Sequence, residues 1–103
     1  MSAAPAEAFI AALRARRSIA EKVMIVAAHP DDETIGIGAQ LGRFQDLLIV
    51  HATDGAPCDM RDAARYGFAR REDYAAARRN ELANALAASG AAHARTLARR
   101  RYP

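Results

Sequence analysis

The densest group of chemically capable side chains in this sequence is His29-Pro30-Asp31-Asp32-Glu33. Zinc accepts imidazole nitrogen and carboxylate oxygen, so a histidine and an aspartate three residues apart are suitable ligands. A second carboxylate beside them would remain available as a base toward water. The same segment has a structural interpretation, because proline and acidic residues at a helix start satisfy unpaired N–H groups and complement the helix dipole. The spacing leaves metal binding and helix capping as equal alternatives.

Two apolar runs on either side of this segment predict buried strands. Residues 23–28 read Val-Met-Ile-Val-Ala-Ala, and residues 47–53 begin Leu-Leu-Ile-Val. Continuous runs of this kind are typical of parallel strands covered on both faces. Apolar residues between the runs recur at helical intervals, so we expect a helix over residues 33–44. The order strand, helix, strand predicts a right-handed crossover whose strand ends open on one edge of the sheet, where ligands bind.

The remaining segments complete an α/β chain of one domain, residues 1–103. Pro5 and the apolar spacing after it predict a short covering helix at the start, and a longer helix from about residue 72 to 89 ends at Gly90. Residues 55–70, between the second predicted strand and the longer helix, are irregular. A third strand is expected near residues 93–98, within a basic tail. The predicted fold is an incomplete, Rossmann-like, three-layer α/β arrangement around a parallel sheet.

One side of the longer helix combines apolar and charged residues. Residues 74, 78, 82 and 86 recur on this side, and the apolar members turn it inward. Arg78 and Glu81 therefore face inward, while Arg79 points elsewhere. Arg78 is expected either to form an ion pair with Glu81 or to contact a substrate.

The composition disfavours several classes of function. The net charge is +3, but acidic residues are interleaved among the arginines and no aromatic is placed to stack on bases, so nucleic-acid binding is not expected. No apolar run approaches the roughly 18 residues that cross a bilayer, and the start lacks the pattern of a signal peptide. A single cysteine, Cys58, fits a reducing compartment. We expect a soluble cytoplasmic protein without a membrane partner.

The stretch Ala28-His29-Pro30-Asp31-Asp32-Glu33, directly after an apolar run, closely resembles the signature of the PIG-L or LmbE-like de-N-acetylases. The likeness extends to Gly36, Gly38, Thr53-Asp54-Gly55, Arg78-Arg79-Asn80-Glu81-Leu82, Leu86 and Gly90. It covers about residues 22–90 and leaves residues 91–103 as a divergent basic tail.

The resemblance implies a role for each matching residue. His29 and Asp32 would bind zinc, and Asp31 would be the general base that takes a proton from the metal-bound water. Arg78 would contact the substrate, which in this family is an N-acetylated amino sugar or its conjugate. Thr53 and Asp54 are expected to line the pocket, although a simple turn is the alternative. His51, inside the second strand, is interpreted as a hydrogen-bonded core histidine, and His93 as exposed.

The sequence departs from the family pattern in one important respect. The third zinc ligand of the family is a histidine far downstream, and His93 lies too early to take that role. A site with two ligands should bind zinc weakly. The alternative function is therefore a truncated, non-catalytic remnant, with apolar surface available for self-association. Nucleotide binding is disfavoured, because Gly36 and Gly38 lie within the expected helix rather than in the turn before it.

Overall fold

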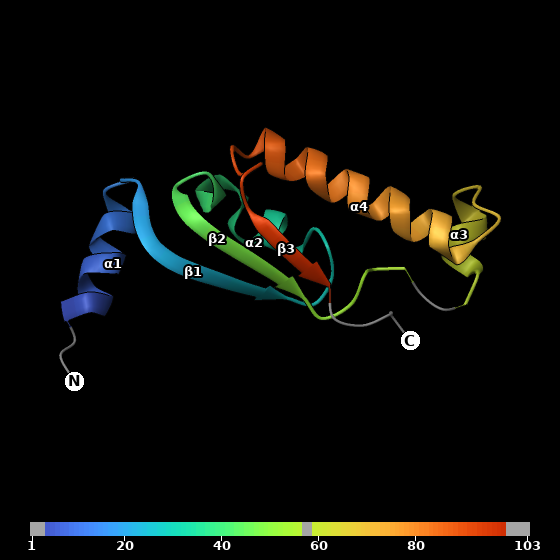
Figure 1. Cartoon of the computed structure of the whole chain (residues 1–103), viewed down its shortest axis with the longest axis horizontal. Coiled ribbons are helices and arrows are strands. Elements are labelled where there is room, and N and C mark those ends of the chain that lie inside the picture. Colours follow the sequence, from blue (N-terminus) through green and yellow to red (C-terminus); the bar gives the residue numbers. More distant parts are fainter. Residues whose placement is uncertain (1–3, 57–58, 99–103) are drawn as a thin grey trace.

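The computed structural model describes residues 4–56 and 59–98, which form a parallel sheet with helices beside it. The elements in chain order are α1 (Ala4–Arg14), β1 (Ile19–Ala27), α2 (Asp32–Leu41), β2 (Phe44–His51), α3 (Arg61–Arg65), α4 (Arg71–Ala88) and β3 (Arg95–Ala98). The strands lie in the order β1-β2-β3, and both neighbouring pairs are parallel. Figure 1 shows α1 and α3 at opposite ends of the molecule. The predicted incomplete α/β fold and its third strand are confirmed.

The boundary between α2 and β2 lies earlier than the sequence predicted. Residues 33–44 were expected to be one helix, but α2 ends at Leu41 and Phe44 is the first residue of β2. Gly42 caps the helix, and Phe44 pairs with Ile19 at the start of the sheet. Phe44 is only 2% exposed. Its burial at the start of the sheet, and not its helical spacing from earlier apolar residues, therefore determines its strand conformation.

The hydrophobic core lies between the sheet and the helices α2 and α4. The cluster contains Ile19, Leu41, Phe44, Leu47, Ile49, Leu82, Leu86 and Ala91. Helix α1 adds Phe9, whose ring stacks on that of Phe44 with centroids 6.4 Å apart. Helix α1 therefore packs at the end of the sheet where β1 and β2 begin, as Figure 1 also shows.

The expectation that the strands are covered on both faces is wrong for this sheet. Met24 and Val26 of β1 are 62% and 71% exposed, and Leu97 of β3 is 51% exposed. The register places Val26, Val50 and Leu97 side by side on one face. Helices α2 and α4 pack against the other face. The described residues therefore form two layers, one helical layer and the sheet, of the three that were predicted.

The C-terminal end of α4 is confirmed as a glycine cap. Gly90 has a φ of 78°, in the region that glycine adopts most readily. Its N–H donates to the Ala87 carbonyl at 3.1 Å, and the Ala91 N–H donates to the Leu86 carbonyl at 2.7 Å. This pair of bonds defines a Schellman motif, which ends the helix and directs the chain toward β3. No helix within the described ranges is both long and apolar enough to cross a membrane.

Substitution of Phe44 tests whether the core is centred where β2 begins. We expect Phe44→Ala to lower the free energy of unfolding by about 3–5 kcal/mol, because it opens a cavity at a fully buried site. Ile35→Ala on α2 is the control, since Ile35 is 82% exposed and should change stability by less than about 0.5 kcal/mol. Urea unfolding followed by circular dichroism measures both, and equal losses would contradict this packing.

Candidate functional site

Parallel pairing brings the ends of β1 and β2 to the same edge of the sheet. Ala27 is paired with His51, and the backbone bonds continue past both strands. The Ala52 N–H donates to the Ala27 carbonyl at 2.9 Å, and the Thr53 N–H donates to the Ala28 carbonyl at 3.1 Å. The loop that carries His29 therefore lies directly beside the loop that follows β2, as the crossover predicts.

His29 and Asp32 approach each other within the loop between β1 and α2. The His29 N–H donates to Asp32 Oδ2 at 3.0 Å, and His29 Nδ1 lies 3.9 Å from the same oxygen. Two ligands placed 2.0–2.1 Å from a tetrahedral zinc ion are about 3.3 Å apart, so these donors need only a small adjustment. Their types and their separation fit a zinc ion.

Asp31 has a backbone conformation that the helix start alone does not require. Its φ of 99° lies in the left-handed region, which costs an L-residue on the order of 1–3 kcal/mol. Its side chain forms no capping bond with α2, while the Asp32 carboxylate turns back toward His29. Side-chain capping therefore does not explain Asp31, whereas Asp32 lies in the first turn of α2 and complements the helix dipole there. Strained residues of this kind cluster at functional sites, which favours a role in binding or chemistry.

Arg78 connects α4 to this loop. Its Nη2 donates to the Pro30 carbonyl at 3.1 Å, and its Nη1 lies 3.8 Å from Asp31 Oδ2. The ion pair of Arg78 is thus with Asp31 across the site rather than with Glu81 on its own helix. Gly55 makes this contact possible, because a Cβ there would lie 2.8 Å from Arg78 Nη2.

The side chains of Thr53 and Asp54 organise the loop after β2. Asp54 forms a largely buried ion pair with Arg71, and its Oδ1 accepts the Ala56 N–H at 3.0 Å. Thr53 Oγ1 accepts the Gly55 N–H at 3.2 Å. These bonds favour the turn interpretation of this segment. A direct substrate contact from either side chain stays a prediction.

A cavity of about 220 Å³ lies over the His29 loop. Its lining residues are His29, Asp31, Asp32, Gly55, Asp62, Tyr74 and Arg78. Sequence reasoning missed Asp62 and Tyr74 as lining residues. The helical spacing of Tyr74 from Arg78 could have indicated it, whereas Asp62 lies in a stretch without periodicity. Burial raises the pKa of the Tyr74 phenol above its ordinary value of 10.0, while the charge of Arg78 opposes the rise and that of Asp62 adds to it.

Fewer metal donors converge on one point in the cavity than a complete site requires. Within the described ranges, no group of three or more His, Cys, Asp or Glu side chains is arranged to hold a metal ion. His29 and Asp32 are two donors, and catalytic zinc sites generally have three protein ligands plus water. The residues thus fit part of a zinc coordination sphere.

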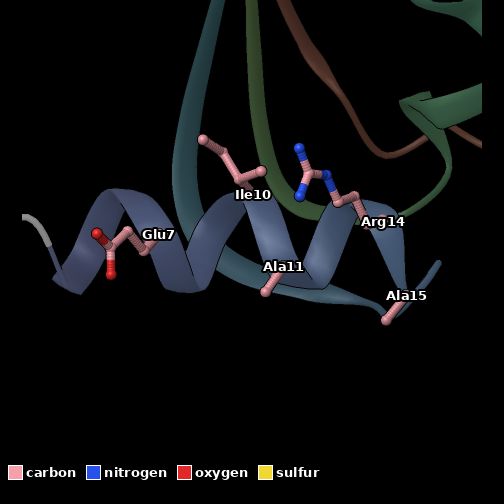
Figure 2. A pocket seen from close by; sticks show the side chains of 5 residues that line it. All are labelled: Glu7, Ile10, Ala11, Arg14 and Ala15. Atoms are coloured by element: carbon pink, nitrogen blue, oxygen red, sulfur yellow. The ribbon is translucent and has the colours of Figure 1, made fainter.

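A larger hollow of about 620 Å³ lies along the outer side of α1 and carries no comparable chemistry. Figure 2 shows its lining side chains, Glu7, Ile10, Ala11, Arg14 and Ala15. All five residues are exposed, and they come from one helix and the residue after it. Glu7 and Arg14 are its only charged groups. This hollow is an open helix surface rather than a candidate site.

A buried pair beneath the loop joins α2 to β2. His51 Nε2 and Glu33 Oε2 lie 2.8 Å apart, and both side chains are at most 1% exposed. The interpretation of His51 as a hydrogen-bonded core histidine is confirmed. His93 is exposed as predicted, although its Nε2 lies 2.6 Å from the Phe44 carbonyl oxygen.

We expect Glu33→Ala to lower the free energy of unfolding by about 1–3 kcal/mol, because it leaves the buried His51 ring nitrogen without its hydrogen-bond partner. Glu33→Gln retains a side chain that can hydrogen-bond to His51 and should lose less. Urea denaturation of the two variants measures the difference. Equal losses would show that the contact with His51 does not stabilise the first turn of α2.

Two glycines with positive φ allow the contact with Arg78 to be tested. Gly55 and Gly67 have φ values of 75° and 85°, but a Cβ on Gly67 would meet no atom within 4 Å. Gly67→Ala should therefore lose only the roughly 1–2 kcal/mol of left-handed strain. Gly55→Ala should lose about 1 kcal/mol more through crowding and should shift the NMR signal of the Arg78 side chain. An unchanged Arg78 signal would contradict the packing described above.

Comparison with known families agrees with this geometry. The sequence model of the PIG-L family, described as GlcNAc-PI de-N-acetylase, matches residues 24–103. Comparison with curated proteins finds no match. The matched range contains the His29 loop, the loop after β2 and α4, and it continues through β3, beyond the end of the motif likeness at residue 90. A match over well more than half of the sequence identifies the chain as a member of the PIG-L family.

Proposed function

We propose that the chain contributes to zinc-dependent hydrolysis of the N-acetyl group of an N-acetylglucosaminyl-type amino sugar or conjugate. Membership of the PIG-L family supports a de-N-acetylase type of function. The observation that carries the proposal to this chain is the approach of His29 and Asp32, whose donor atoms lie 3.9 Å apart beside Asp31. His29 and Asp32 would hold the metal, and Asp31 would be the general base.

The reaction requires water to add to the acetamide carbonyl carbon and the C–N bond to break. Bound zinc would supply a water of pKa about 7 and polarise the carbonyl oxygen. Asp31 is the proton acceptor for the water and returns that proton to the departing amine, so that acetate and a free amino sugar are released. Arg78 holds the Asp31 carboxylate and the Pro30 carbonyl, which limits the movement of the base. Tyr74 lines the same cavity, and its hydroxyl would donate a hydrogen bond to the sugar.

A non-catalytic role is the second candidate, and the donor count favours it. No third donor joins His29 and Asp32 in the described part of the chain. Such a chain would act, if at all, as a binding or oligomerising module, and the uncovered face with Met24 and Val26 offers apolar surface for self-association. A cytoplasmic location remains part of the proposal on the basis of the single cysteine.

Zinc titration combined with a deacetylation assay on N-acetylglucosaminyl substrates tests the proposal. We expect weak zinc binding and slow turnover by the unaltered chain. His29→Ala should lower zinc affinity at least about tenfold, because one ligand is lost. Asp31→Asn should leave zinc affinity nearly unchanged and reduce the remaining turnover by about a hundredfold or more.

His93→Ala is the matched control, because it removes an exposed imidazole outside the cavity. Its zinc affinity should equal that of the unaltered chain. Zinc affinity lost in His93→Ala and kept in His29→Ala would contradict the ligand assignment. Tight stoichiometric zinc with turnover abolished in both His29→Ala and Asp31→Asn would instead reject the non-catalytic alternative and require a third ligand from this chain or a second copy.

A further inference from the structure

Helix α1 has two faces of different character. Its inner face packs against the core cluster through Phe9, Ala12 and Leu13. Its outward face, shown in Figure 2, consists of exposed residues: Glu7, Ile10, Ala11, Arg14 and Ala15. The helix also precedes residues 24–103, the range that the PIG-L family model matches. The outward face is therefore a feature of this chain that the family model does not describe.

The two charged residues of the outward face lie on one line along the helix. Glu7 and Arg14 are seven residues apart, so they differ by only about 20° around the helix axis and by about 10.5 Å along it. Neither side chain forms an ion pair with another residue in the described ranges. Both charges complement the dipole of α1, but the dipole does not account for Ile10, which lies between them and is 47% exposed. Opposite charges on either side of an exposed apolar residue match a partner with the reverse order of charges.

A second copy of α1 in antiparallel orientation has this reverse order. A two-fold axis between residues 10 and 11 places Glu7 of each copy opposite Arg14 of the other. The two Ile10 side chains then meet beside the axis, and the small side chains of Ala11 and Ala15 allow the helices to approach closely. A parallel copy would instead place like charges against each other, which is repulsive. The charge order therefore selects the antiparallel arrangement.

We propose that the outward face of α1 is a self-association surface, through which two copies of the chain form an antiparallel dimer. The helix has 11 residues and is about 16 Å long, so the contact is smaller than the roughly 800 Å² per partner of a standard interface. Association is therefore weak and depends on concentration. The His29 loop lies at the opposite end of β1 from α1, so the dimer leaves the cavity of each copy open. This proposal does not depend on the proposed hydrolysis.

Charge reversal on the outward face, followed by analytical ultracentrifugation, tests the proposal. We expect the unaltered chain to dimerise as its concentration rises. Glu7→Arg and Arg14→Glu should each weaken the dimer about tenfold, because two attractive contacts become repulsive contacts of similar size. An equimolar mixture of the two variants should recover the dimer. One variant has two arginines on this face and the other has two glutamates, so every charged contact between unlike variants is attractive again.

Arg79→Glu is the matched control, since it reverses an exposed arginine on α4, which Figure 1 shows apart from α1. It should leave the dimer unchanged, and circular dichroism should show the same helix content in all variants. A chain that stays monomeric up to about 1 mM, an equal loss in Arg79→Glu, or a mixture that associates no better than either α1 variant alone would overturn the proposal. A dimer that persists in both α1 variants and is lost in Met24→Ser would assign self-association to the uncovered face of the sheet, which also overturns it.

Discussion

The parallel pairing of β1 with β2 is the constraint on which the candidate site depends. The ladder continues beyond both strands through the bonds from Ala52 to Ala27 and from Thr53 to Ala28. These backbone bonds alone place the loops after β1 and β2 side by side at one edge of the sheet. The buried pair of Glu33 and His51 then anchors the first turn of α2 to β2. The position of His29 and Asp32 is therefore set by the backbone and core beneath them.

A second set of contacts, from α4, holds the loop that carries His29. Arg78 reaches from α4 to the Pro30 carbonyl and the Asp31 carboxylate, and Gly55 leaves the space through which it reaches. Asp31 keeps its left-handed conformation between these restraints. Such backbone strain persists only where surrounding contacts enforce it. The packing of α4, which positions Arg78, therefore helps to keep Asp31 in this conformation. The Arg71 and Asp54 ion pair similarly ties the start of α4 to the loop after β2.

The sequence predicted the parts of this arrangement that depend on local pattern. The apolar runs, the crossover and the position of the His29 loop follow from periodicity and chain order, and the Gly90 cap follows from residue type. Periodicity could not place Phe44, because apolar spacing does not distinguish a helix end from a strand start. It could not show that Met24 and Val26 lie on an open face, because coverage depends on distant elements. Asp62 was missed as a lining residue because residues 55–70 have no regular pattern.

X-ray absorption spectroscopy of the zinc-loaded chain tests the metal assignment most directly. We expect nitrogen and oxygen scatterers at about 2.0–2.2 Å with the multiple scattering of one imidazole, the remaining positions being filled by water. His29→Ala should abolish the imidazole contribution while Glu33, His51 and the fold are left in place. An imidazole signal that persists in His29→Ala, or a sulfur shell at about 2.3 Å, would show that zinc binds elsewhere and would contradict a metal site in the loop after β1.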